Sequence, residues 1–139
     1  MRRIVVDTGP IVALLNRKDQ YHEWAVRTFD GLEPPLFTCE AVLAEAMWLV
    51  RKLPNGPTAV IDLLTRDVLR TDFQIDTERL ALRTLLTKYA SVPMSLADAC
   101  LVRMTELDPR AEVVTLDGDF RGYRRSGRLA IRLIMPDGA

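Results

Sequence analysis

Four acidic residues stand among apolar or turn residues in this sequence, and their side chains could together bind metal ions. They are Asp7, Glu45, Asp98 and Asp117. Mg²⁺ and Mn²⁺ are hard cations that prefer carboxylate oxygens and water. Several carboxylates at one point repel each other unless cations offset their charge. Such a site could activate water against a phosphodiester without a catalytic histidine or cysteine, which agrees with a chain whose single histidine is His22.

Two of these acids, Asp7 and Asp117, each follow a short apolar run that we interpret as a buried strand. The runs cover residues 4–6 and 113–116. In open α/β sheets, ligands bind beyond the carboxyl ends of the strands, so both acids can face one crevice. The alternative for each is a turn aspartate whose side chain caps the local backbone.

Glu45 lies in the most apolar helix that the sequence predicts, over residues 40–52. A helix that is apolar nearly all round should be largely buried, and a buried carboxylate must be paired, neutralised or bound to metal. The alternative is a buried ion pair with an arginine. Glu40 lies about 140° away around the helix. We interpret it as a residue that stabilises the helix start.

Asp98 lies near the start of a helix that we expect from Ser95 to about Leu107. A carboxylate at that end of a helix is stabilised in its charged form, as a metal ligand requires. The alternative is a capping box in which Ser95 is the N-cap and Asp98 reaches back to it. Asp119, two residues after Asp117, is either a further ligand or a loop acid.

Alternating strands and helices would position these acids. We predict strands near residues 3–7, 36–38, 71–75, 112–116 and 130–135, with helices near residues 10–17, 20–31, 40–52, 58–68, 77–90 and 95–107. Residues 117–127 are expected to be loop. This alternation predicts the α/β class, with a mostly parallel sheet of four or five strands covered on both faces. A chain of 139 residues suits a single domain over residues 1–139.

Composition is that of a globular protein, with 48% hydrophobic and 27% charged residues. The net charge of zero counts against bulk nucleic-acid binding by a basic surface. The distribution is uneven, however, because residues 121–132 contain five arginines and no acid. The candidates for binding an RNA backbone are Arg121, Arg124, Arg125 and Arg128. The alternative is a solvated loop.

Cysteine content and hydropathy indicate a cytoplasmic protein that does not span a membrane. Cys39 and Cys100 are too few for a disulfide framework, which favours a reducing cytosol. The longest apolar stretch, residues 41–50, is interrupted by Glu45 and is too short for a transmembrane helix. The short apolar run before Asp7 does not fit a signal peptide.

Four segments, taken together, resemble PIN-domain proteins in their order, spacing and placement on strands or helices. They are residues 4–16, residues 38–45, Ser95-Leu96-Ala97-Asp98-Ala99 and residues 114–120. The resemblance spans residue 4 to about residue 134. The sequence departs from the family at Cys39, where members often carry serine.

The resemblance implies a three-layer α/β/α fold with a central parallel sheet, Mg²⁺ or Mn²⁺ as cofactor, and cleavage of RNA. Small members of the family resemble VapC toxins, which implies an RNA substrate, a separate antitoxin chain and a homodimer. By position, the acidic quartet of the family matches Asp7, Glu45, Asp98 and Asp117. Thr8 and Thr115 match positions where a hydroxyl supports the site, and Asp119 matches an accessory acid.

Three other classes share features with the sequence. Asp7-Thr8-Gly9 matches the signature of aspartic proteases, but those chains are all-β and rich in glycine turns. A response-regulator receiver needs an acidic pair and a late lysine, whereas the lysines here are Lys18, Lys52 and Lys88. The third alternative keeps the PIN fold as a catalytically silent module that binds RNA or protein.

Overall fold

A five-stranded parallel sheet forms the centre of the computed structural model, which describes residues 3–139. The strand order is β3-β2-β1-β4-β7, and all four pairings are parallel. The strands are β1 (Ile4–Val6), β2 (Leu36–Thr38), β3 (Leu69–Thr71), β4 (Glu112–Val114) and β7 (Arg132–Ile134). β1 is buried along its whole length, as expected for a parallel strand covered on both faces. The predicted α/β class is confirmed.

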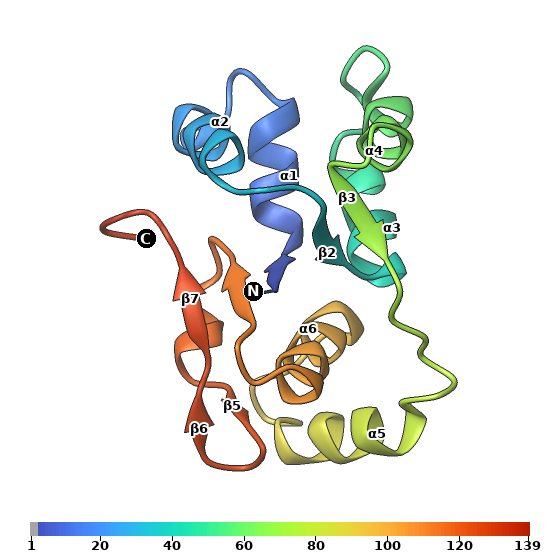
Figure 1. Cartoon of the computed structure of the whole chain (residues 1–139), viewed down its shortest axis with the longest axis vertical. Coiled ribbons are helices and arrows are strands. Elements are labelled where there is room, and N and C mark those ends of the chain that lie inside the picture. The colour runs from blue at the N-terminus through green and yellow to red at the C-terminus, as the bar shows by residue number, and fades with distance from the viewer. Residues whose placement is uncertain (1–2) are drawn as a thin grey trace.

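Six α-helices cover this sheet. They are α1 (Thr8–Leu15), α2 (His22–Gly31), α3 (Glu40–Leu49), α4 (Gly56–Thr65), α5 (Arg79–Lys88) and α6 (Leu96–Leu107). In Figure 1, α1 and α2 lie on one side of the sheet, while α5 and α6 lie on the other. α3 packs against α1, α4 and α6. The arrangement confirms the predicted three-layer α/β/α fold and excludes the all-β aspartic-protease alternative.

The register between β1 and β4 places the two strand-end acids at the same edge of the sheet. Val6 is the partner of Val114. One residue further, the backbone N–H of Asp7 donates to the carbonyl oxygen of Val114 at 2.9 Å. Asp7 and Thr115 therefore leave the sheet side by side, and Asp117 follows two residues later.

Two predicted segments are corrected by the structure. The third strand lies at Leu69–Thr71 rather than 71–75, because its register is set by pairing with β2 rather than by its own composition. The predicted loop 117–127 contains a 3₁₀ helix, η1 (Gly118–Arg121), and the short strand β5 (Arg124–Arg125). β5 pairs antiparallel with β6 (Leu129–Ala130) to form a hairpin. Its turn relies on positive φ angles at Ser126 and Gly127, a local conformation that hydrophobic periodicity does not signal.

The core needs no disulfide. Cys39 and Cys100 are both buried and both free, as the sequence predicts. Over residues 3–139, the helices are all too short or too polar to cross a membrane.

Candidate functional site

A cavity of about 250 Å³ beyond the carboxyl ends of β1 and β4 brings the four predicted acids together. Its lining residues are Asp7, Thr8, Gly9, Glu45, Leu49, Asp98, Leu116 and Asp117. The acids come from four separate places: the end of β1, the middle of α3, the first turn of α6 and the segment after β4. Because one liquid water occupies about 30 Å³, the cavity has room for hydrated cations.

Asp7 is the most buried of the four acids, with 6% of its surface exposed. It is the N-cap of α1, and its Oδ1 accepts a hydrogen bond from the backbone N–H of Thr8 at 2.7 Å. Its Oδ2 accepts from the hydroxyl of Thr115 at 2.7 Å. Burial raises the pKa of Asp7 to about 6, against the effect of these two hydrogen bonds; the charges of Asp98 and Asp117 raise it further. The structure thus holds this carboxylate firmly where ionisation is unfavourable.

The two predicted supporting hydroxyls connect the acids to each other. The hydroxyl of Thr8 donates to Oε2 of Glu45 at 3.1 Å. The hydroxyl of Thr115, besides donating to Asp7, accepts from the backbone N–H of Asp117 at 2.9 Å. Three of the four acids therefore share one hydrogen-bond network.

Glu45 is exposed, and the prediction that its helix is largely buried is wrong. α3 buries only the face that carries Val42 and Ala46, whereas Trp48 is 63% and Leu49 54% exposed. The apolar composition of α3 did not predict its burial correctly, because apolar atoms also make up much of a protein surface. Glu45 lines the cavity from its exposed side, where its carboxylate keeps contact with solvent.

Asp98 forms the capping box that the sequence offered as the alternative, and it also lines the cavity. Ser95 and Asp98 form a complete capping box at the start of α6, so the structural alternative holds. The same carboxylate lines the cavity and accepts a hydrogen bond from the hydroxyl of Tyr123 at 2.9 Å. Burial raises the pKa of Asp98, against the hydrogen bonds from Tyr123 and from the backbone of Ser95, and the charge of Asp117 adds to the rise.

Asp117 and Asp119 differ in their placement. Asp117 is the N-cap of η1, and its Oδ1 accepts from the backbone N–H of Asp119 at 2.9 Å. Asp117 lines the cavity, whereas Asp119 is exposed and is not among the lining residues. The turn-aspartate alternative therefore also holds for Asp117, alongside its position in the cavity.

The cavity contains negative charge without a cationic side chain to offset it. Among residues 3–139, no lysine, arginine or histidine forms an ion pair with any of the four acids, so the ion-pair alternative for Glu45 finds no partner in these residues. Each carboxylate uses at most three of its roughly four lone-pair positions. In the same residues, no three acidic, histidine or cysteine side chains lie close enough to hold a single ion as they stand. The donor set fits a hard cation in type and charge.

The four candidate arginines lie outside the cavity lining, and two of them make hydrogen bonds within the chain. Arg121 donates to the carbonyl oxygen of Ala139 at 2.6 Å, and Arg124 donates to that of Arg121 at 2.8 Å. Within the part of the chain that the structure describes, the guanidinium groups of Arg125 and Arg128 make neither hydrogen bonds nor ion pairs. Those two are the arginines available to an external phosphate.

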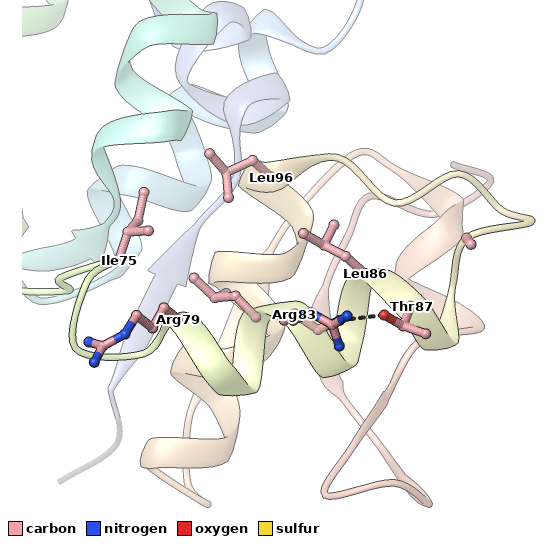
Figure 2. Close-up of a pocket in the computed structure, with 8 residues that line it drawn as sticks. Ile75, Arg79, Arg83, Leu86, Thr87 and Leu96 are labelled. Atoms are coloured by element: carbon pink, nitrogen blue, oxygen red, sulfur yellow. Dashed lines mark hydrogen bonds between the residues drawn. The ribbon is translucent and has the colours of Figure 1, made fainter.

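A second, larger groove of about 570 Å³ has a different character. Figure 2 shows it between α5, the loop before it and the start of α6. Its lining residues are Ile75, Arg79, Leu82, Arg83, Leu86, Thr87, Ala90 and Leu96. With no acid in its lining, this groove has no means of holding a hard cation.

Tyr123 is the site residue that sequence reasoning missed. It lies in the segment that the sequence predicts as loop, so nothing indicated that its ring is buried beside Asp98. The close packing of Gly9 was also missed: a Cβ there would lie 3.3 Å from side-chain atoms of Leu116.

Comparison with known proteins defines the class of this molecule. The model of the PIN domain family matches residues 4–125, and the chain therefore belongs to that family. A similar solved structure is that of Mycobacterium tuberculosis VapC20, a toxin that cleaves the sarcin-ricin loop. It shares 26% sequence identity and a TM-score of 0.75, over 93% of this chain and 98% of that one. No curated protein sequence matches the chain.

Proposed function

We propose that this protein is an endoribonuclease that hydrolyses RNA phosphodiester bonds with Mg²⁺ or Mn²⁺ held by the acidic cavity. The ligands would be Asp7, Glu45, Asp98 and Asp117. The observation that carries the proposal is their convergence from four separate elements on one cavity without a basic partner among residues 3–139. Membership of the PIN domain family and the similarity to a ribonucleolytic toxin support it.

The chain's own residues determine where a cation and a phosphate would meet. A bound divalent cation supplies Lewis-acid stabilisation of charge on phosphate oxygens and favours ionisation of water. Asp7 is fixed by two short hydrogen bonds at the base of the cavity. Glu45 lies on its exposed side, held by the hydroxyl of Thr8. The candidate ligands therefore include Asp7, which is buried and hydrogen-bonded, and Glu45, which solvent can reach.

RNA would be held partly by residues outside the cavity. Arg125 and Arg128 belong to the β5–β6 hairpin and its turn, and neither guanidinium is used within the described chain. Arginine binds phosphate oxygens through paired N–H groups. We assign them to the RNA backbone, with Arg121 and Arg124 in a supporting position, and Asp119 as an accessory acid next to Asp117.

The similarity to VapC20 extends the proposal to a biological role. We propose a cytoplasmic toxin of a type II toxin–antitoxin pair, with a separate antitoxin chain and a homodimeric form. The gene beside its own is the simplest place to look for the antitoxin, and light scattering on the purified protein measures the dimer. Because VapC20 cleaves the sarcin-ricin loop, a synthetic RNA hairpin of that sequence is the first substrate to test.

A cleavage assay separates this proposal from a silent binding module. The labelled hairpin and a scrambled hairpin are incubated with wild-type protein in Mn²⁺, in Mg²⁺ or in chelator, beside Asp7→Asn. The proposal expects cleavage with metal, none with chelator and none by the variant. Glu45→Gln is expected to impair cleavage, whereas Glu40→Gln on the same helix is the matched control and should not. RNA binding without cleavage in any metal would favour the silent module instead.

A further inference from the structure

Tyr123 is a buried tyrosine whose hydroxyl touches a cavity acid. It lies between η1 and β5, and 1% of its surface is exposed. Its hydroxyl donates to Oδ2 of Asp98 at 2.9 Å. A buried tyrosine hydroxyl generally needs a partner, and here the partner is a carboxylate that lines the cavity rather than a backbone carbonyl.

The ring of Tyr123 is fixed by aromatic neighbours. Phe120 packs edge-on at 5.2 Å between ring centroids, and Tyr89 does so at 5.0 Å. Such contacts favour one ring orientation over others. The hydroxyl is therefore presented to Asp98 from a rigid position, and a phenol is protonated and able to donate at neutral pH.

The hydrogen bonds on Asp98 are unequal between its two oxygens. Oδ2 accepts from Tyr123 and, at 3.5 Å, from the backbone N–H of Ser95. Both of these donors contact Oδ2, so neither of them occupies Oδ1. Tyr123 thus holds the carboxylate through Oδ2 and does not compete with a cation for Oδ1.

We propose that Tyr123 is a positioning residue that orients Asp98 for divalent-cation binding. The proposal depends on the function proposed above only for the identity of the cation site. Partners that orient metal ligands in this way typically contribute about 10- to 100-fold to metal affinity or activity. The contribution acts through Asp98, and Tyr123 itself contacts neither metal nor RNA.

The test compares two tyrosines of the same aromatic cluster. Tyr123→Phe removes the hydroxyl but keeps the ring, whereas Tyr89→Phe removes a hydroxyl that accepts from the backbone N–H of Arg124 at 2.8 Å and touches no acid. Mn²⁺ affinity is measured by calorimetry without RNA, and circular dichroism checks that each variant is folded. We expect the Kd to rise about tenfold in Tyr123→Phe and to stay within about twofold of wild type in Tyr89→Phe.

A double-variant cycle shows whether the effect passes through Asp98. If it does, adding Tyr123→Phe to Asp98→Asn changes the Mn²⁺ affinity by less than about twofold. The reason is that Tyr123 can no longer orient a carboxylate at position 98. Equal Mn²⁺ affinity of wild type and Tyr123→Phe would overturn the proposal. So would a full tenfold loss in the Asp98→Asn background, which would show an effect independent of that ligand.

The outcomes for positioning and for function are distinguishable. Wild-type protein that binds Mn²⁺ but cleaves no RNA removes the proposed function, while a weakened Tyr123→Phe still supports positioning. Wild-type protein that cleaves RNA and shares its Mn²⁺ affinity with Tyr123→Phe keeps the function and removes the positioning role. Absence of Mn²⁺ binding by wild-type protein overturns both.

Discussion

Helix α6 contributes to two clusters of acidic side chains. One cluster is paired with an arginine, and the other has no basic partner among residues 3–139. Near the middle of the helix, Arg103 contacts Glu78 at 2.8 Å and Glu106 at 3.2 Å. Glu106 also accepts from the backbone N–H of Ser126 at 2.6 Å. All three charged side chains are largely shielded, with 27, 15 and 12% exposed for Arg103, Glu78 and Glu106. At the start of the same helix, Asp98 shares its cavity with three more acids and with no basic side chain of residues 3–139.

The difference shows what each cluster serves. The hydrogen bond to Glu78 is the main cause of a raised pKa at Arg103, so this pairing stabilises the charged form of the arginine. In the cavity, burial and mutual repulsion instead raise the pKa of Asp7 and Asp98. The acids around Arg103 are thus neutralised within the chain, whereas no basic side chain of residues 3–139 pairs with the four acids of the cavity, as the proposed cation site requires.

The largest expected effect is on activity. Asp7→Asn removes a charged ligand while keeping an amide of similar shape as N-cap of α1. Because metal-assisted stabilisation contributes several kcal/mol, the cleavage rate should fall roughly a thousandfold. Initial rates on the RNA hairpin measure it. A cleavage rate within about tenfold of wild type would show that the Asp7 carboxylate is not needed for catalysis.

The same substitution should stabilise the metal-free protein, which sharpens the comparison with the Arg103 cluster. The pKa of Asp7 is about 6 in the folded chain and 3.8 ordinarily, so between these values the folded state binds more protons. Its contribution therefore lowers stability as pH rises from about 4 through about 6, by about 3 kcal/mol at most. Urea unfolding in chelator at several pH values should show this decline in wild type and a flatter curve in Asp7→Asn. An unchanged pH dependence in the variant would contradict it.

Removing the arginine from the Arg103 cluster should destabilise the protein, whereas Asp7→Asn should stabilise it. Arg103→Met leaves Glu78 and Glu106 shielded without their cation and is expected to lower the free energy of unfolding by about 2 kcal/mol. Metal binding should stay unchanged. Arg70→Met is the control, because its ion pair with Asp67 is exposed and should contribute less than about 1 kcal/mol. If both variants lose the same free energy of unfolding, the Arg103 cluster contributes no more to stability than an exposed ion pair.

The smallest effect concerns RNA affinity. Replacing Arg125 or Arg128 by alanine should reduce the slope of log K against log salt by about 0.7 for each phosphate of single-stranded RNA that the side chain neutralises. Binding titrations with Asp7→Asn as the inactive background avoid cleavage during the measurement. An unchanged slope in both variants would show that neither arginine neutralises an RNA phosphate.

Reasoning from the residues predicted the layers and the strand-end acids because both have local signals, whereas the hydroxyls of Thr8 and Thr115 were implied by the resemblance to PIN-domain proteins. Buried parallel strands are continuous apolar runs, and the boundaries of β2 match the prediction at both ends. Features set by tertiary contact were missed. The exposure of Glu45 depends on which face of α3 packs inward, and the contact of Tyr123 with Asp98 joins residues 25 positions apart.

Thermal unfolding with and without Mn²⁺ tests most directly whether the four acids of the cavity bind a divalent cation. A ligand at about a hundred times its Kd adds about 2.7 kcal/mol to stability, which for a chain of this size raises the melting temperature by about 5 °C or more. Wild-type protein near neutral pH should show this rise, and Asp7→Asn should show little of it. Equal melting temperatures of wild type in Mn²⁺ and in chelator would contradict the account.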